Sequence, residues 1–419
     1  MAHRTGSADL PLHGGQVPHW LAARMARLGR VIVEAIVQHY GRDEFLRRLA
    51  HPFWFQSFGA VMGMDWHSSG ITTSVMGALK RGLAPVQQEL GIHVCGGRGR
   101  HSRDTPAELV AVGERVGVNG DALAQISRLV AKVDSAAVQD GFDLYLHSFV
   151  VTDDGAWSVV QQGMNTERRQ ARRYHWLSEG LQSFVDQPHT AIDGPNQGLI
   201  VNLTDRRAED SRNCQVELTR GDPDRVVAML HKVRAGALPH LHMPAHHDVR
   251  FSDVLLRRLR ATLAAAADRG PADFAELLLV PGLGARTVFA LARASEVVHG
   301  APCRFSDPAR FSLAHGGKDG HPFPVPVKVY DETIRVMRSA VDHAKLGLAD
   351  KLAAIRHLDE QARALEHAVT GSSLKQFVAR ESLDASDYGG RTVWDQGRSS
   401  SVVGEQPPLR RKPRQLVLL

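Results

Sequence analysis

Carboxylate, imidazole and amide side chains gather in the N-terminal half of the chain. The residues with the chemistry for catalysis are Asp65, His67, Asp134, Asp140, His147 and Gln161. Aspartates together with a histidine can hold a divalent metal that activates water for phosphodiester hydrolysis. We expect Mg²⁺ or Mn²⁺ as the metal, with Asp65, Asp134 and Asp140 as its ligands. This interpretation predicts a metal-dependent nuclease.

The same residue types allow other interpretations. An aspartate can direct water to a sugar carbon while Gln161 contacts a flipped base, as in a monofunctional DNA glycosylase. Asp134 and Asp140 are equally suited to ion pairs or helix caps, and His147 to a core. Restriction-type nucleases carry a carboxylate and a lysine where this chain has Gln161 and Gly163, which weighs against that class. No pattern indicates an organic cofactor.

A second functional segment is residues 276–296, which read ELLLVPGLGARTVFALARASE. The pattern predicts a helix, a tight turn and another helix. Gly282 and Gly284 permit positive φ and a close approach of backbone to a ligand. The start of the second helix offers free N–H groups to a phosphate, and Arg286 and Thr287 stand at that start. The segment resembles a helix-hairpin-helix DNA-binding element, although a turn between two core helices can have the same composition.

Two further loops combine glycine with basic residues. Arg98 and Arg100 lie in GGRGRHSR, and Lys318 lies in HGGKDGHP. Both loops suit phosphate contacts, or are solvated turns. Helix-hairpin-helix glycosylases with lyase activity place a lysine where this chain has Arg286, which cannot act as an amine nucleophile. Such glycosylases also carry a catalytic aspartate after the hairpin, for which Asp307 is the nearest candidate.

The elements that must position these residues follow from hydrophobic periodicity. Strands are predicted over 143–151 and 156–163, because an Asp-Gly turn separates them, and over 198–203. Alternation along the first strand predicts that Tyr145 and His147 share one face. Helices are predicted over the segments 18–49, 106–116, 121–138, 223–233, 252–268, 328–348 and 350–367.

These elements indicate an α+β fold: a mixed domain with a hairpin-containing sheet, then a mainly helical domain. We expect a catalytic domain over residues 1–210, a helical DNA-binding domain over 211–370 and a flexible basic tail over 371–419. The first boundary is expected within 205–222, where the chain is charged and short of apolar residues. The tail is rich in proline and arginine, which is typical of a loosely docked segment.

Composition supports a nucleic-acid partner. The net charge is +6, and 43% of the 419 residues are hydrophobic, enough for a sizeable core. Basic proteins favour phosphate-bearing ligands, although a GC-rich genome also enriches arginine. The three cysteines are far apart, and no apolar run has transmembrane length. We therefore expect a cytoplasmic protein with DNA as its partner and no membrane; the oligomeric state stays open.

Several longer motifs resemble the uncharacterised family of domain of unknown function 763. They are RTGSADLPLHGG, HPFWFQSFG, DWHSSGITT, KVDSAAVQDGFDLYLH, VVQQGMN, RRYHWLS and DPARFSLAHGGKDGHPFPV. The resemblance extends over most of the chain to about residue 370. It implies no particular activity, so the functional expectation rests on the residues: a DNA-processing hydrolase, in DNA repair, or a DNA-binding module without catalysis.

Overall fold

The computed structural model describes residues 10–11, 19–62, 64, 70–168, 170–235, 256–309 and 339. Among the helices in these ranges, none combines the length and the apolar character that crossing a membrane requires. Helices and antiparallel sheets together form an α+β fold, as the sequence predicted.

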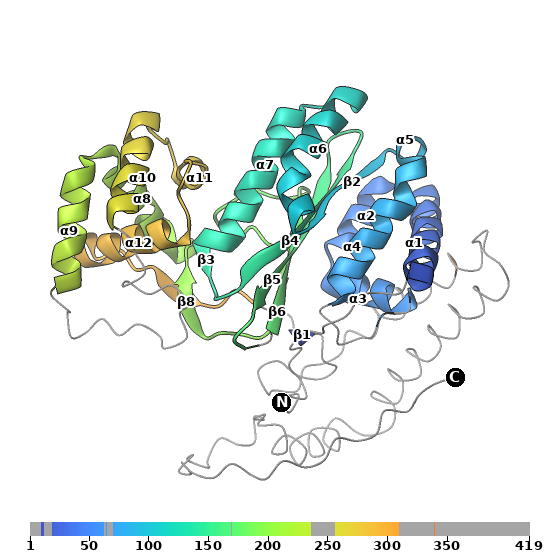
Figure 1. Cartoon of the computed structure of the whole chain (residues 1–419), viewed down its shortest axis with the longest axis horizontal. Coiled ribbons are helices and arrows are strands. Elements are labelled where there is room, and N and C mark those ends of the chain that lie inside the picture. Colours follow the sequence, from blue (N-terminus) through green and yellow to red (C-terminus); the bar gives the residue numbers. More distant parts are fainter. Residues whose placement is uncertain are drawn as a thin grey trace, which may run out of the picture.

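A six-stranded antiparallel sheet forms the centre of the molecule (Figure 1). Its order is β1-β6-β5-β4-β2, and β7 pairs with β6. The strands are β1 (Leu10–Pro11), β2 (Ile92–Arg98), β4 (Asp143–Thr152), β5 (Trp157–Asn165), β6 (Gln170–Leu177) and β7 (Ala191–Asp193).

The predicted hairpin of β4 and β5 is confirmed. Gly155 has a φ of 85°, and its N–H donates to the carbonyl of Thr152, which closes the turn. Only glycine adopts this φ without steric cost, so the Asp-Gly pair fixes where the chain reverses. The turn thereby sets the register that brings His147 opposite Gln161.

Each face of the sheet is covered by its own helices and has its own hydrophobic core. Val150 and Val160 face the first group of helices, while Phe149 and Val159 face the second. The first group is α1 (His19–Tyr40), α2 (Arg42–Leu49), α3 (Pro52–Val61) and α4 (Gly70–Leu83). The second group is α6 (Arg100–Val116) and α7 (Gly120–Lys132), and Figure 1 shows the sheet between the two groups. The α4 face and the α7 face are named after these helices below.

The chain from residue 199 onward adds helices and two of the three strands of a small sheet. The helices are α8 (Glu209–Arg220), α9 (Pro223–Ala235), α10 (Leu256–Arg269), α11 (Phe274–Leu278) and α12 (Ala285–His299). The three-stranded sheet has the order β3-β8-β9, with β3 (Val138–Gln139), β8 (Leu199–Asn202) and β9 (Arg304–Ser306). These helices share one continuous core with the α7 face of the large sheet.

The predicted helices over 223–233 and 252–268 agree with α9 and α10 within a few residues. The helix predicted over 18–49 is two helices, α1 and α2, which are separated at Gly41. No helix was predicted where α3 and α4 lie. The predicted helix over 121–138 ends earlier: α7 stops at Lys132, and a π-helical turn, η2 (Val133–Ala137), leads into β3. Where the charged segment 205–222 predicted a domain boundary, the chain forms α8. The boundary itself stays a prediction. The predicted helices after residue 328 and the predicted tail lie outside the described residues, apart from the single residue 339.

The predicted placement of Tyr145 beside His147 is wrong. The register of β4 on β5 shifts between Leu144 and Leu146, so Tyr145 is the extra residue of a β-bulge. A bulge reverses the direction of the side chain that it inserts. His147 contacts Gln161 on the α7 face, whereas Tyr145 receives a hydrogen bond from Gln162 on the α4 face.

Candidate functional site

Three of the predicted catalytic residues meet on the α7 face of the sheet. His147 Nδ1 lies 2.7 Å from Gln161 Oε1, and Gln161 Nε2 donates to Asp134 Oδ2 at 2.5 Å. The other ring nitrogen of His147 lies 2.8 Å from the hydroxyl of Ser127 in α7. Four side chains are therefore linked by hydrogen bonds, in the order Ser127, His147, Gln161 and Asp134.

Burial determines the protonation state of the histidine among these four linked side chains. It lowers the pKa of His147, so the imidazole is neutral at pH 7. Because the Gln161 amide donates to Asp134, its oxygen accepts the Nδ1–H of His147. The Nε2 atom then accepts from Ser127. A serine, a histidine and an orienting amide in this order resemble the start of a nucleophilic triad.

The location of the chain argues against that use. Ser127 is 2% exposed and Gln161 is 0% exposed, so no substrate atom reaches the hydroxyl. The Asp134 carboxylate has further partners: Trp176 Nε1 donates to it at 3.0 Å, and His189 Nε2 lies 2.5 Å from it. The four residues therefore form a satisfied polar network inside the core.

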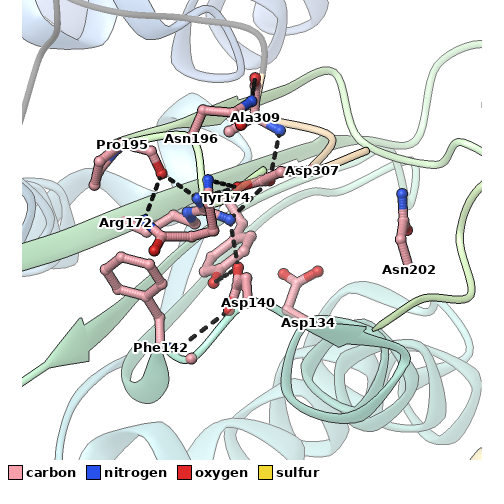
Figure 2. A network of polar contacts seen from close by, with 12 residues as sticks. Asp134, Asp140, Phe142, Arg172, Tyr174, Pro195, Asn196, Asn202, Asp307 and Ala309 are labelled. Atoms are coloured by element: carbon pink, nitrogen blue, oxygen red, sulfur yellow. Dashed lines mark hydrogen bonds and ion pairs between the residues drawn. The ribbon is translucent and has the colours of Figure 1, made fainter. Parts of the chain in front are cut away.

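A second network surrounds Arg172 of β6 (Figure 2). Its guanidinium donates to Asp140 Oδ2 at 2.8 Å and to both oxygens of Asp307, at 3.0 and 2.6 Å. The hydroxyl of Tyr174 donates to the same Asp140 oxygen at 2.7 Å, and the ring of Phe142 lies 4.7 Å from the guanidinium carbon. Asp307 was the candidate aspartate for glycosylase chemistry, and here both of its oxygens bind Arg172.

Charge is unevenly distributed in this second network. Burial raises the pKa of Asp140 to about 6, against the opposing effect of Arg172. Burial also acts to lower the pKa of Arg172, but the two aspartates outweigh it and raise this pKa. One fully buried cation therefore serves two fully buried carboxyl groups.

These contacts leave little room for the predicted metal. Asp140 is occupied by Arg172, Tyr174 and the N–H of Phe142, and Asp134 by its own donors. Across the described ranges, no three His, Cys, Asp or Glu side chains are grouped so that they could hold a metal ion. Asp65, the third predicted ligand, and His67 lie outside the described residues.

The α4 face carries residues that the sequence did not single out. Arg173, the next residue of β6, donates to Asp193 at 2.7 Å, to Gln56 at 3.0 Å and to Thr72 at 3.4 Å. Tyr145 is half-buried beside this group. The motif RRYHWLS contained both arginines, but adjacent arginines in a strand buried on both faces give no periodic signal.

The glycine and arginine loop is shorter than predicted, because α6 begins at Arg100. Arg98 ends β2, is exposed, and lies 5.8 Å from the ring centroid of Tyr145. Arg100 is exposed as well, with its Nε 3.6 Å from Asp104 in the next turn. Both side chains can reach solvent anions. Lys318 lies outside the described residues.

The segment between α11 and α12 forms a tight turn. Gly282 has a φ of 82°, and Gly284 precedes the helix with an extended backbone. Arg286 is exposed, and Thr287 is buried, with its N–H 3.0 Å from the carbonyl of Gly284. The turn is held from the N-terminal half by Lys132, whose ammonium donates to the carbonyl of Leu283.

The family comparison covers both the sheet and this turn. The family model described as "Protein of unknown function (DUF763)" matches residues 6–325. The chain belongs to this family. No curated protein and no solved structure matches the chain. Within the DUF763 match lie both polar networks of the α7 face and the turn before α12.

Proposed function

We propose that this DUF763 protein binds DNA through the sugar–phosphate backbone, at a helix-hairpin-helix element formed by α11, the turn and α12. The open start of α12 carries the proposal. The N–H groups of Ala285 and Arg286 have no hydrogen-bond partner in the described part of the chain, and no side chain caps the helix. Free N–H groups and the positive end of the helix dipole attract a phosphate.

The glycines of the turn support a close approach. Gly282 occupies the left-handed region, which other residues adopt at a cost. Gly284 has an ordinary extended φ of −143°, and a Cβ placed on it would meet no atom within 4 Å in the described structure. The fold therefore does not require glycine at position 284. A ligand whose backbone must come close to the turn does require glycine at position 284.

Arg286 supplies the charge for such a ligand. It is exposed, it stands in the first turn of α12, and no carboxylate among the described residues pairs with it. A contact to phosphate does not depend on base identity, so the expected binding has no sequence preference. The net charge of +6 adds long-range attraction.

Fluorescence anisotropy with a labelled duplex of mixed sequence tests the proposal. Arg286→Glu should weaken binding on the order of tenfold, the usual scale for a lost charged contact, and lower the salt dependence of log K by about 1. Gly284→Ala should weaken binding with unchanged stability. Arg81→Glu is the matched control, because Arg81 is exposed on the distant α4. If Arg286→Glu and Arg81→Glu have equal effects, the turn is not the binding site.

Hydrolysis of DNA, by a nuclease or a glycosylase, receives less support. Asp134, Asp140, His147 and Gln161 are all buried and fully engaged in the protein. Their positions favour a DNA-binding or recruiting role over catalysis by these four side chains. A panel of single-stranded, nicked, branched and base-damaged DNAs, with and without Mg²⁺ or Mn²⁺, checks this. Cleavage that Asp134→Asn abolishes without loss of stability would contradict it.

A further inference from the structure

Lys132 connects the N-terminal half to the turn that precedes α12. It is the last residue of α7, and its ammonium donates to the carbonyl of Leu283, 151 positions further along the chain. Gln139 of β3 makes a parallel contact, donating to the carbonyl of Ala285 at 2.9 Å. In Figure 1 the end of α7 lies near α12, and η2, which follows α7, packs against α12. Two side chains from one half therefore hold the turn and the first residue of α12, and only one of the two is charged.

The charge of Lys132 is not balanced within the described protein. Its ammonium forms no ion pair with a described carboxylate. The acidic residues nearest in sequence are engaged elsewhere, Asp134 with His189 and Asp140 with Arg172. The side chain is half-buried, and this burial lowers its pKa. A carbonyl oxygen satisfies one of its three N–H donors and only part of its charge.

A partly desolvated ammonium without a counter-ion is unfavourable unless an anion completes its surroundings. Gly284, the residue after Leu283, begins the segment whose free N–H groups face a phosphate in the proposed complex. The cation thus lies against the same turn. We infer that Lys132 is a second phosphate-binding group, which joins the N-terminal half to the DNA held by α12.

This inference rests on the proposed function and adds a consequence for pH. A bound phosphate stabilises the protonated ammonium and raises its pKa above that of the free protein. Binding therefore takes up a proton once the pH approaches the lowered pKa of free Lys132. Affinity for duplex DNA should therefore fall as the alkaline pH rises towards 10.5, the ordinary value for lysine, below which the pKa of free Lys132 lies. Arginine at this position keeps its charge over that range, so Lys132→Arg should bind with a flatter pH profile.

The experiment measures duplex binding by anisotropy over a range of salt and pH for Lys132→Gln, Lys132→Arg and Gln139→Leu. Lys132→Gln should weaken binding on the order of tenfold at low salt and lower the salt slope by about 1. Gln139→Leu removes an uncharged contact with the first residue of α12, so its salt slope should equal that of the wild type. Urea denaturation of each variant reports its folding.

The outcomes separate this inference from the proposed function. If Lys132→Gln keeps the wild-type salt slope while Arg286→Glu loses affinity, the turn binds DNA but Lys132 contacts no phosphate. If Lys132→Gln and Gln139→Leu change affinity equally with unchanged salt slopes, Lys132 only holds the turn. If Arg286→Glu changes nothing, the proposed function itself fails. Where Lys132→Gln does not fold, the pH profiles of wild type and Lys132→Arg decide the matter, and parallel profiles overturn the inference.

Discussion

The two faces of the large sheet each bury an arginine, and consecutive residues of β6 supply them. On the α7 face, Arg172 binds two carboxyl groups, those of Asp140 and Asp307. On the α4 face, Arg173 binds one carboxyl group, that of Asp193, and neutral oxygens complete its contacts. The pKa of Arg172 is raised, whereas burial lowers the pKa of Arg173. Two neighbouring carboxylates outweigh the effect of burial on the pKa of Arg172, whereas one carboxylate does not outweigh it for Arg173.

The two networks also join different parts of the chain. Asp307 follows β9, beyond all the helices from α8 to α12, so Arg172 ties the C-terminal part to the large sheet. The partners of Arg173 all come from the sheet and from α3 and α4. The α7 face therefore holds the protein together over a long sequence separation, and the α4 face stabilises the N-terminal part alone.

Removing each arginine in turn has the largest expected effect. Arg172→Met leaves Asp140 and Asp307 buried without a cation, and should lower the free energy of unfolding by about 3–5 kcal/mol at pH 7. Arg173→Met leaves only Asp193 without a cation and should lower the free energy of unfolding by a smaller amount. Urea denaturation followed by circular dichroism measures both. Equal losses would show that the extra carboxylate has no energetic consequence.

The sequence predicted the strands of the hairpin, but it did not predict the side-chain contacts that form the two networks. The Asp-Gly turn located β4 and β5, whereas the contact of His147 with Gln161 is known only from the structure. The sequence could not locate β6, because a strand buried on both faces has no alternation. Asp134, Asp140, His147 and Gln161 were expected in one site; the structure links three of them, but Asp140 belongs to the network of Arg172. The partners Arg172 and Asp307 are 135 residues apart, and only the folded chain brings them together.

The pH dependence of stability is the next largest effect. Burial raises the pKa of Asp140 and of Asp193 to about 6, from 3.8 in the unfolded chain. The folded state therefore binds more protons between about pH 4 and 6. The stability from each group is present below this window and is lost as pH rises through 6, by about 3 kcal/mol for a pKa difference of this size.

Single substitutions separate the two aspartates from other titrating groups. His147 and His175 have lowered pKa values, so they make the folded state less stable as pH falls below 6.5 and oppose the aspartates. We expect the difference in unfolding free energy between wild type and Asp193→Asn to change over pH 4–6, measured from urea midpoints. Asp140→Asn should do the same on the other face. Parallel pH curves for wild type and variant would contradict the raised pKa values.

Replacing the two buried histidines should lower the free energy of unfolding by different amounts, and this difference is smaller than the effects above. His147→Leu leaves the Ser127 hydroxyl and the Gln161 amide oxygen without their partner and should cost about 1–3 kcal/mol beyond the change in packing. His175→Leu loses one hydrogen bond, to the carbonyl of Leu49 at 3.2 Å, and removes a ring nitrogen that has no hydrogen-bond partner among the described residues. Thermal and urea unfolding of both variants test this order. A larger loss for His175→Leu would mean that the α7-face chain contributes little to stability.

Removing one phenolic hydroxyl from each face is the smallest change. Tyr174→Phe removes a donor from the buried carboxyl group of Asp140, and contacts to charged groups are worth about 1.5–3 kcal/mol. Tyr145→Phe removes a contact with the neutral amide of Gln162 at a half-buried position, worth about 0.5–1.5 kcal/mol. The aromatic ring that remains in the second variant would still lie beneath Arg98, so the bulge keeps its packing.

The comparison of these two variants tests whether charge or burial alone distinguishes the faces. At pH 5, below its raised pKa, Asp140 is largely protonated, so the hydroxyl of Tyr174 no longer donates to a charged group. The loss from Tyr174→Phe should then shrink towards that of Tyr145→Phe, which has no carboxyl partner to titrate. Unfolding free energies of both variants at pH 5 and pH 7.5 measure this. If the gap between them stays constant, burial rather than carboxylate charge makes the α7 face the more costly one to disrupt.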